Sequence, residues 1–253
     1  MKPLAIITGA SAGFGRATAE LLARNDFDII ITGRRIEKLE ELEEQIRLKT
    51  EADVLSLAFD IRDHNAVKKA CEQIAGKWEN VDVLVNNAGL AAGLSHIHEG
   101  SVDDWEQMID TNIKGLLYMT RMISPGMVKR QKGHIINIGS IAGKEAYEKG
   151  NVYCATKFAV DGLTQGMRID LIDHGIKVTS IDPGAAETEF SLVRFKGDSN
   201  MADQVYDGYT PLYAEDIAEA ILFVVTRPPH VNIDDMLIMP TAQARSRKFN
   251  RIN

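Results

Sequence analysis

Short apolar segments alternate with longer helix-like segments along nearly the whole chain, and this alternation limits the fold more than any other feature. The apolar segments are rich in β-branched residues and lie at 4–8, 28–32, 54–60, 82–86, 134–138, 177–181 and 236–239. Near-continuous apolar content predicts strands that are buried on both faces, as in a parallel sheet. The order of the segments therefore predicts an α/β fold with a doubly wound, mostly parallel seven-stranded sheet, helices on both faces and right-handed crossovers.

The segments between the predicted strands follow helical periodicity. Ile36, Leu39, Leu42 and Ile46 form an apolar helical stripe, and Ser101 is a plausible N-cap for a helical segment at 101–123. No linker, repeat or low-complexity segment interrupts the pattern, so we expect a single domain spanning residues 1–253.

Two stretches fall outside this pattern. Residues 185–212 predict a long irregular loop, and a loop of that length in a compact domain is often a lid or a substrate-binding segment. Residues 241–253 form a basic C-terminal tail that contains Arg245, Arg247, Lys248 and Arg251.

Charge and cysteine content exclude several classes of function. A net charge of −7 argues against non-specific nucleic-acid binding, which needs a basic surface. Cys71 and Cys154 have no disulfide or zinc-ligand spacing, and the scattered histidines predict no metal site. The sequence shows no signal peptide and no apolar run long enough to span a membrane. We therefore expect a cytoplasmic protein that acts on a small molecule.

The first predicted strand leads directly into the glycine-rich sequence T-G-A-S-A-G-F-G at 8–15, and a helix follows. Glycines at 9, 13 and 15 allow the backbone to turn sharply and to approach a ligand closely, and a helix N-terminus attracts a pyrophosphate. The spacing differs from the general G-x-G-x-x-G fingerprint. Its position after the first strand of a doubly wound sheet nevertheless predicts a Rossmann-type dinucleotide site.

The end of the second predicted strand indicates which dinucleotide is bound. An acid there favours NAD, whereas arginine accommodates the 2′-phosphate of NADP. The sequence I-T-G-R-R at 31–35 has no acid, and Arg34 and Arg35 offer charge-assisted donors to a phosphate. We therefore predict NADP(H), the alternative being two solvated arginines at the start of a surface helix.

Further cofactor contacts are expected where the next strands end. Asp60 closes the third predicted strand and could reach the adenine, and N-N-A-G at 86–89 closes the fourth. Both could instead be turn chemistry, since Asn, Asp and Gly favour turns.

Tyr153 precedes Lys157 by four residues on a predicted helix, so the two side chains share a face. A phenol is a weak acid–base group at neutral pH unless a nearby cation stabilises its anion. Ser140 ends the fifth predicted strand, at the edge where open α/β sheets bind ligands. Asn112 lies inside the 101–123 segment. Packing alone is the alternative for the tyrosine.

Taken together, T-G-A-S-A-G-F-G, N-N-A-G, Asn112, Ser140 and Y-C-A-T-K resemble the short-chain dehydrogenase/reductase family over essentially the whole chain. The resemblance implies that Tyr153 is the general acid–base, that Lys157 lowers its pKa and binds the nicotinamide ribose, and that Ser140 holds the substrate oxygen. It implies that Asn112 supports a proton-relay water through a backbone bend. The cofactor-binding residues predicted in this way are Gly9, Ser11, Gly13, Phe14, Gly15, Arg34, Arg35, Asp60, Ile61, Asn87, Ala88, Gly89, Tyr153, Lys157, Pro183, Gly184 and Thr188.

N-N-A-G-L-A-A-G, G-N-V-Y-C-A-T-K and T-E-F-S-L-V-R-F-K-G-D look similar to the NADP-dependent 3-hydroxy acid dehydrogenases within that family. This implies oxidation of serine, allo-threonine or related 3-hydroxy acids, or reduction of malonic semialdehyde. Such substrates need a partner for their carboxylate, and the bidentate guanidinium of Arg194 is our first candidate. Lys144, Tyr147 and the basic tail are the others.

The family resemblance also implies a homotetramer, in which the tail could close a neighbouring subunit's site. Two alternatives remain open at this stage. The enzyme could reduce another carbonyl compound, such as a 3-oxoacyl thioester, a sugar or a polycyclic alcohol. The chain could also be a regulator that binds NADP without turnover, although the complete set Asn112, Ser140, Tyr153 and Lys157 argues against this.

Overall fold

The computed structural model describes residues 2–252, of which Asp203 is described by its backbone alone, and is built on one seven-stranded sheet. The strand order is β3-β2-β1-β4-β5-β6-β7, and every pairing is parallel. This confirms the predicted doubly wound α/β fold, with strand ends shifted by a residue or two. The strands are β1 (Leu4–Ile7), β2 (Asp28–Gly33), β3 (Val54–Ala58), β4 (Val81–Asn86), β5 (Gly133–Ile138), β6 (Ile176–Pro183) and β7 (Asp235–Ile238).

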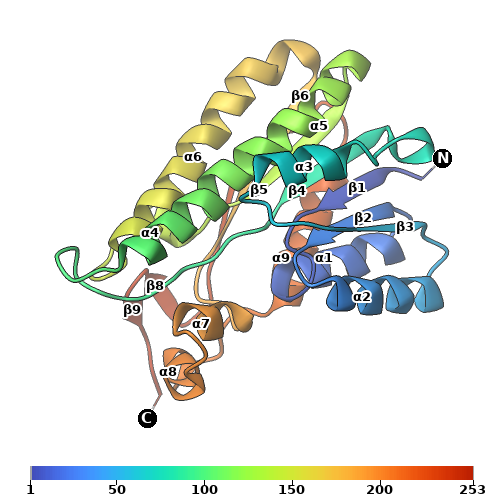
Figure 1. Ribbon diagram of the computed structural model, residues 1–253. Helices are drawn as coiled ribbons and strands as arrows, with labels where there is room; N and C mark the ends of the chain where they lie inside the picture. The colour runs from blue at the N-terminus through green and yellow to red at the C-terminus, as the bar shows by residue number, and fades with distance from the viewer. Residues whose placement is uncertain (1, 253) are drawn as a thin grey trace.

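Helices cover both faces of the sheet (Figure 1). One face carries α1 (Gly13–Arg24), α2 (Ile36–Lys49) and α9 (Ala214–Val225). The other carries α3 (His64–Cys71), α4 (Val102–Ile109), α5 (Leu116–Arg130) and α6 (Asn151–Leu171), with a π-helical turn, η2 (Asp110–Gly115), between α4 and α5. Three short 3₁₀ turns complete this part of the chain: η1 (Gly76–Trp78), η3 (Ile141–Gly143) and η4 (Ile172–His174).

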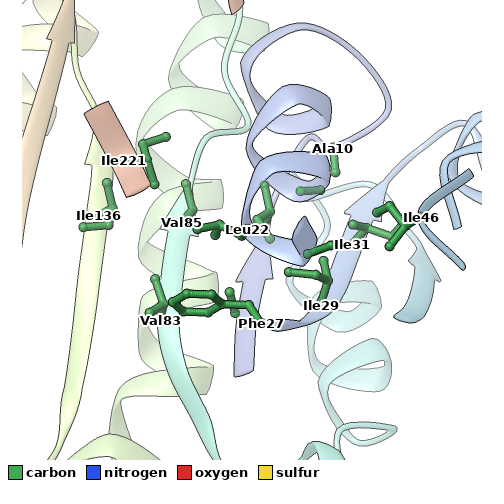
Figure 2. Packing of buried hydrophobic residues seen from close by; sticks show 14 of the residues in the cluster. Ala10, Leu22, Phe27, Ile29, Ile31, Ile46, Val83, Val85, Ile136 and Ile221 are labelled. Carbon is green, nitrogen blue, oxygen red and sulfur yellow. The ribbon is translucent and has the colours of Figure 1, made fainter. Parts of the chain in front are cut away.

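Alternation along the strands supplies both helical layers with apolar side chains. Ile7 packs with Leu22 of α1 on one face, while its neighbour Ile6 packs with Met119 of α5 on the other, and all three isoleucine and leucine side chains are fully buried. Figure 2 shows the first of these cores, in which side chains of β1, β2, β4 and β5 meet those of the covering helices. The near-continuous apolar character of the strands follows from this two-sided burial.

The predicted stripe on α2 is three residues long rather than four. Leu39, Leu42 and Ile46 are buried, but Ile36, the first residue of the helix, is exposed because it precedes the turn that packs on the sheet. The predicted N-cap is confirmed, since the Ser101 hydroxyl accepts a hydrogen bond from the Asp104 amide at the start of α4.

The prediction of an irregular loop at 185–212 was wrong. This segment contains α7 (Glu189–Arg194), α8 (Ser199–Asp203) and the 3₁₀ turn η5 (Gln204–Tyr206). Thr188 caps α7 by accepting from the Phe190 amide, and Asp198 caps α8 by accepting from the Met201 amide. The two helices have only 6 and 5 residues, so neither shows a recognisable apolar periodicity in the sequence.

The C-terminal tail folds back on the same chain. Residues Gln243–Arg245 (β8) and Lys248–Phe249 (β9) pair as a small antiparallel hairpin, and the Ile252 amide donates to the Gly208 carbonyl. Figure 1 shows this hairpin near α7 and α8. The tail thus lies over its own subunit, and a contribution to a neighbouring subunit's site stays a prediction.

Between residues 2 and 252, none of the helices is both long and apolar enough to cross a membrane.

Candidate active site

A cavity of about 600 Å³ lies where the strands end. Its walls come from the loops after β1, β2, β3, β4, β5 and β6, from the 185–212 segment and from the tail. The predicted site residues line this cavity, with three exceptions, which are Gly15, Asn112 and Lys144. The cavity therefore brings together residues that are distant in sequence.

The glycine-rich loop forms a cradle that larger residues could not form. Gly9 has a φ of +67°, and a Cβ there would stand 2.9 Å from the Ala88 Cα. Gly15 lies beneath the loop, where a Cβ would stand 2.5 Å from Asn87 Nδ2. Among the described residues no side chain caps the N-terminus of α1 at Ala12, so its first amides are available to an anion. The cradle fits the pyrophosphate of a dinucleotide.

Thr8 joins this cradle to the segment after β4, a role that the sequence reading missed. Its hydroxyl accepts from the amides of Asn87 and Ala88, each at 2.9 Å, and the Asn87 side chain donates to the Thr8 carbonyl at 2.7 Å. The hydrogen bonds fix Asn87–Gly89 beside the cavity. A threonine that directly precedes the first glycine was the signal in the sequence.

The adenosine end of the cavity is basic. Arg34 and Arg35 are exposed and line it after β2. Arg35 donates to the Ser11 hydroxyl at 3.1 Å and forms an ion pair of 2.9 Å with Glu189 at the start of α7. Asp60 also lines the cavity, but its carboxylate is held by Arg62 at 2.6 Å, and this hydrogen bond keeps the pKa of Asp60 below its usual range.

Tyr153 and Lys157 lie on α6 with their side chains buried in the cavity wall. The Tyr153 ring packs edge-on against Phe190 at a centroid distance of 5.6 Å. The Lys157 ammonium donates to the Ile138 carbonyl at 2.8 Å and stands 6.0 Å from the centre of the Tyr153 ring. Burial lowers the pKa of Lys157 to about 8, while Asp182 opposes this shift.

The pKa of Tyr153 is raised by burial in this structure, with hydrogen bonding from Ser140 and the charge of Arg194 acting against the shift. The lowering of the Tyr153 pKa by Lys157 stays a prediction, and in this structure the Lys157 ammonium donates to the Ile138 carbonyl. Tyr153 is therefore a protonated phenol at neutral pH in this state.

Ser140 follows β5 and is held at several atoms. Its amide donates to Asp182 Oδ1 at 2.9 Å, and its hydroxyl accepts from the Ala142 amide at 3.1 Å and donates to the Pro183 carbonyl at 3.4 Å. Asp182 was not predicted from the sequence. An acid at the end of an otherwise apolar strand was the available signal.

Asn112 lies in the π-helical turn η2, which gives the predicted bend in the backbone. Its side chain is buried and outside the cavity lining. The amide group exchanges two hydrogen bonds of 2.8 Å with the backbone of Leu90 and donates to the Thr156 hydroxyl at 3.0 Å. Asn112 thus joins the segment after β4 to the helix that carries Tyr153.

Lys144 does not face the cavity, contrary to its candidacy as a substrate ligand. Its ammonium pairs with Asp161 of α6 at 2.6 Å, with Asp182 of β6 at 3.4 Å and with Asp235 of β7. Burial alone would lower the pKa of Lys144, but hydrogen bonds from the ammonium to Asp161 and Asp235 raise it.

Arg194 of α7 reaches the reaction centre. Its Nη1 donates to the Tyr147 hydroxyl at 2.9 Å, and its guanidinium carbon lies 5.6 Å from the centre of the Tyr153 ring. Among the described residues, no partner accepts from Nε or Nη2, although both atoms are buried. Arg247 of the tail lies 4.8 Å from the Tyr147 ring and also lines the cavity. The site therefore contains unpaired guanidinium donors next to a protonated phenol.

Stability should depend on pH through Lys157. Between its folded pKa of about 8 and its ordinary value of 10.5, the unfolded chain binds a proton that the folded chain has lost. Stability contributed by this group therefore rises with pH across that window. As the pH rises from about 8 to 10.5, the free energy of unfolding of the wild type should increase relative to that of Lys157→Met, by up to about 3 kcal/mol.

Urea denaturation of both proteins at several pH values measures this difference, with the exposed Lys49→Met as a control that shows no such trend. A difference that is flat or falls as the pH rises would contradict the assigned burial of Lys157.

The chain is similar in sequence and fold to known dehydrogenases. The short chain dehydrogenase family matches residues 3–197. The NADP-dependent 3-hydroxy acid dehydrogenase YdfG of Salmonella typhi is 47% identical over 242 residues, covering 95% of this chain and 96% of that protein. The NADP-dependent 3-hydroxy acid dehydrogenase of Schizosaccharomyces pombe is 43% identical over 247 residues, covering 97% and 95%.

Solved structures resemble the fold closely. The closed form of serine dehydrogenase complexed with NADP+ superimposes with a TM-score of 0.93 at 43% identity, covering 99% of both chains. Serine dehydrogenase from Escherichia coli gives a TM-score of 0.83 at 40% identity, covering 95% of this chain and 99% of that one. The family match spans most of the chain and includes the cradle, Ser140, Tyr153 and Lys157. The chain belongs to the short-chain dehydrogenase family.

Proposed function

We propose that this protein is an NADP-dependent oxidoreductase that interconverts a small 3-hydroxy acid and the corresponding 3-oxo acid. The substrates would be of the serine, allo-threonine or 3-hydroxypropionate and malonic semialdehyde type. The observation that carries the proposal is the buried guanidinium of Arg194, whose Nε and Nη2 lack partners among the described residues and lie beside Tyr153. The names of the related dehydrogenases support the same substrate class.

The chain supplies the proton and orients the reacting oxygen. Burial keeps the Tyr153 phenol protonated, which is the state that donates to the oxygen of a carbonyl being reduced. The Ser140 hydroxyl, fixed by Ala142 and Pro183, would hold the same oxygen. When bound, the nicotinamide supplies or accepts the hydride. Phe190 packs against Tyr153 and limits access of water to the phenol.

Recognition of the substrate carboxylate would fall to Arg194. Arginine stays protonated and presents two parallel donors that match a carboxylate. Its Nη1 donates to the Tyr147 hydroxyl, and its Nε and Nη2 are buried without an acceptor among the described residues. Arg247 adds positive charge on the Tyr147 ring. A bound carboxylate would give the buried Arg194 donors the partners that they lack.

Replacing Arg194 with Met should raise the KM for 3-hydroxypropionate at least about 30-fold, because one partner of a buried charge pair is removed. Steady-state assays with NADP and a panel of L-serine, L-allo-threonine, 3-hydroxypropionate, malonic semialdehyde and a 3-oxoacyl thioester measure this. Lys196→Met is the matched control, since Lys196 is an exposed cation of the same segment, paired with Asp104. An unchanged KM in Arg194→Met, or no turnover of any 3-hydroxy acid by the wild type, would refute the proposal.

The cofactor proposal rests on Arg34 and Arg35. Both side chains line the adenosine end of the cavity, and no acid stands at the tip of β2 to bind the ribose of NAD. The residues that would hold the pyrophosphate are those of the cradle around Gly9 and Gly13. Solved relatives that contain NADP support the same choice.

The double replacement Arg34→Asp with Arg35→Ala should lower the ratio of kcat/KM for NADP to that for NAD. We expect a change of at least about 100-fold, since each charge-assisted hydrogen bond contributes about 1.5–3 kcal/mol. Arg47→Ala, on the last turn of α2, is the control. A preference for NADP that survives the double replacement would show that this assignment is wrong.

A homotetramer in the cytoplasm is part of the proposal. The outward faces of α5, α6 and η4 expose Leu117, Phe158, Ile169 and Ile172, which are apolar side chains suited to an interface between copies.

Light scattering should give about four times the chain mass of 27.9 kDa, and Phe158→Glu should reduce the measured mass. A monomer in the wild type would contradict the assembly, and cell fractionation tests the location.

A further inference from the structure

Asp182 is a buried carboxylate at the end of β6 that accepts a hydrogen bond from the backbone of Ser140. Its side chain is 1% exposed, and Oδ1 lies 2.9 Å from the Ser140 amide nitrogen. The Gly139 amide donates to the Ile181 carbonyl at 2.8 Å, next to the last paired residues of β5 and β6. The bond from the Ser140 amide to the Asp182 side chain adds one more link between the two segments. The chain turns at this point and directs the Ser140 side chain to the cavity.

The carboxylate leaves no room for a side chain on the residue before Ser140. A Cβ on Gly139 would stand 1.8 Å from Asp182 Oδ1. The position of the carboxylate and the path of the Gly139–Ser140 backbone are therefore determined together. A displacement of Asp182 would shift the amide, and with it the hydroxyl, of Ser140.

Lys144 balances the charge of this carboxylate and connects it to the helix that carries Tyr153. A buried carboxylate is costly unless a cation or hydrogen bonds compensate it. Asp182 Oδ2 has no hydrogen-bond partner among the described residues, but the Lys144 ammonium lies 3.4 Å away. The same ammonium contacts Asp161, which follows Lys157 by one helical turn on α6, at 2.6 Å. Burial raises the pKa of Asp182, and the charge of Lys144 opposes that shift.

We propose that Asp182 and Lys144 form a positioning pair that holds the Ser140 hydroxyl in register with Tyr153 during the reaction. The inference rests on the proposed function, in which Ser140 holds the substrate oxygen. Neither residue touches the substrate, because Lys144 points away from the cavity and Asp182 acts through the Ser140 amide. The pair explains why a lysine close in sequence to Ser140 is directed at three carboxylates rather than into the site.

The test is a double-mutant cycle between position 182 and position 140, measured as kcat in the direction of malonic semialdehyde reduction. Asp182→Ala should lower kcat about 10- to 100-fold, since small misplacements of a catalytic group have effects of that order. The Kd for NADPH should change less than kcat, because Asp182 contacts the Ser140 amide rather than the glycine-rich cradle. In a Ser140→Ala background, Asp182→Ala should have no further effect on kcat.

Conservative and control variants separate positioning from folding. Asp182→Asn keeps an oxygen that can accept from the Ser140 amide, so it should restore most of the kcat lost in Asp182→Ala. Lys144→Met should lower kcat and be equally silent in the Ser140→Ala background, which supplies the same cycle if Asp182→Ala does not fold. Lys132→Met is the matched control, since Lys132 pairs with Asp82 at 2.7 Å at the opposite end of the sheet.

The outcomes are distinguishable. The positioning role alone would be overturned by either of two results. In the first, Asp182→Ala lowers kcat by the same factor in the Ser140→Ala background as in the wild type. In the second, the kcat of Asp182→Ala lies within twofold of that of the wild type. If Ser140→Ala itself leaves kcat unchanged, the proposed function of Ser140 fails instead.

Discussion

The shared carboxyl edge of the parallel sheet is the constraint on which the rest of this structure depends. The strands are buried on both faces and pair in parallel, and parallel strands must be joined by crossovers. For this reason β1, β4, β5 and β6 all end at the same edge. The residues that follow them then meet around one cavity although they are far apart in sequence: Gly9, Asn87, Ser140 and Gly184. Helix α6 and the 185–212 segment add Tyr153 and Arg194 to this edge.

Burial at that edge determines the charge state of the reacting groups. It raises the pKa of the Tyr153 phenol and lowers that of Lys157 to about 8, so both groups are shifted toward their neutral forms. The Arg194 guanidinium lies beside the Tyr153 ring, 5.6 Å from its centre. A fixed cation next to a protonated phenol is an arrangement suited to an anionic carbonyl substrate.

The sequence predicted the sheet and most of the residues that line the cavity because the underlying signals are local. Apolar β-branched runs marked the strands, and the glycine pattern and the Tyr153–Lys157 spacing marked two parts of the cavity. The helices of the 185–212 segment were missed because each is a single capped turn or little more, too short for an apolar period. Lys144 was misassigned for a different reason. Its partners Asp161, Asp182 and Asp235 come from three separate elements, and only the folded sheet brings them together.

In the proposed reaction Tyr153 transfers the proton while the surrounding residues position the substrate and cofactor. Single-turnover reduction of malonic semialdehyde by NADPH in Tyr153→Phe tests this role most directly, with Tyr118→Phe as a control because Tyr118 lies on α5 outside the cavity lining. We expect a loss of at least about 100-fold in rate for Tyr153→Phe, in keeping with the size of general acid catalysis, while the Kd for NADPH is unchanged. A rate close to that of the wild type, with cofactor still bound, would contradict it.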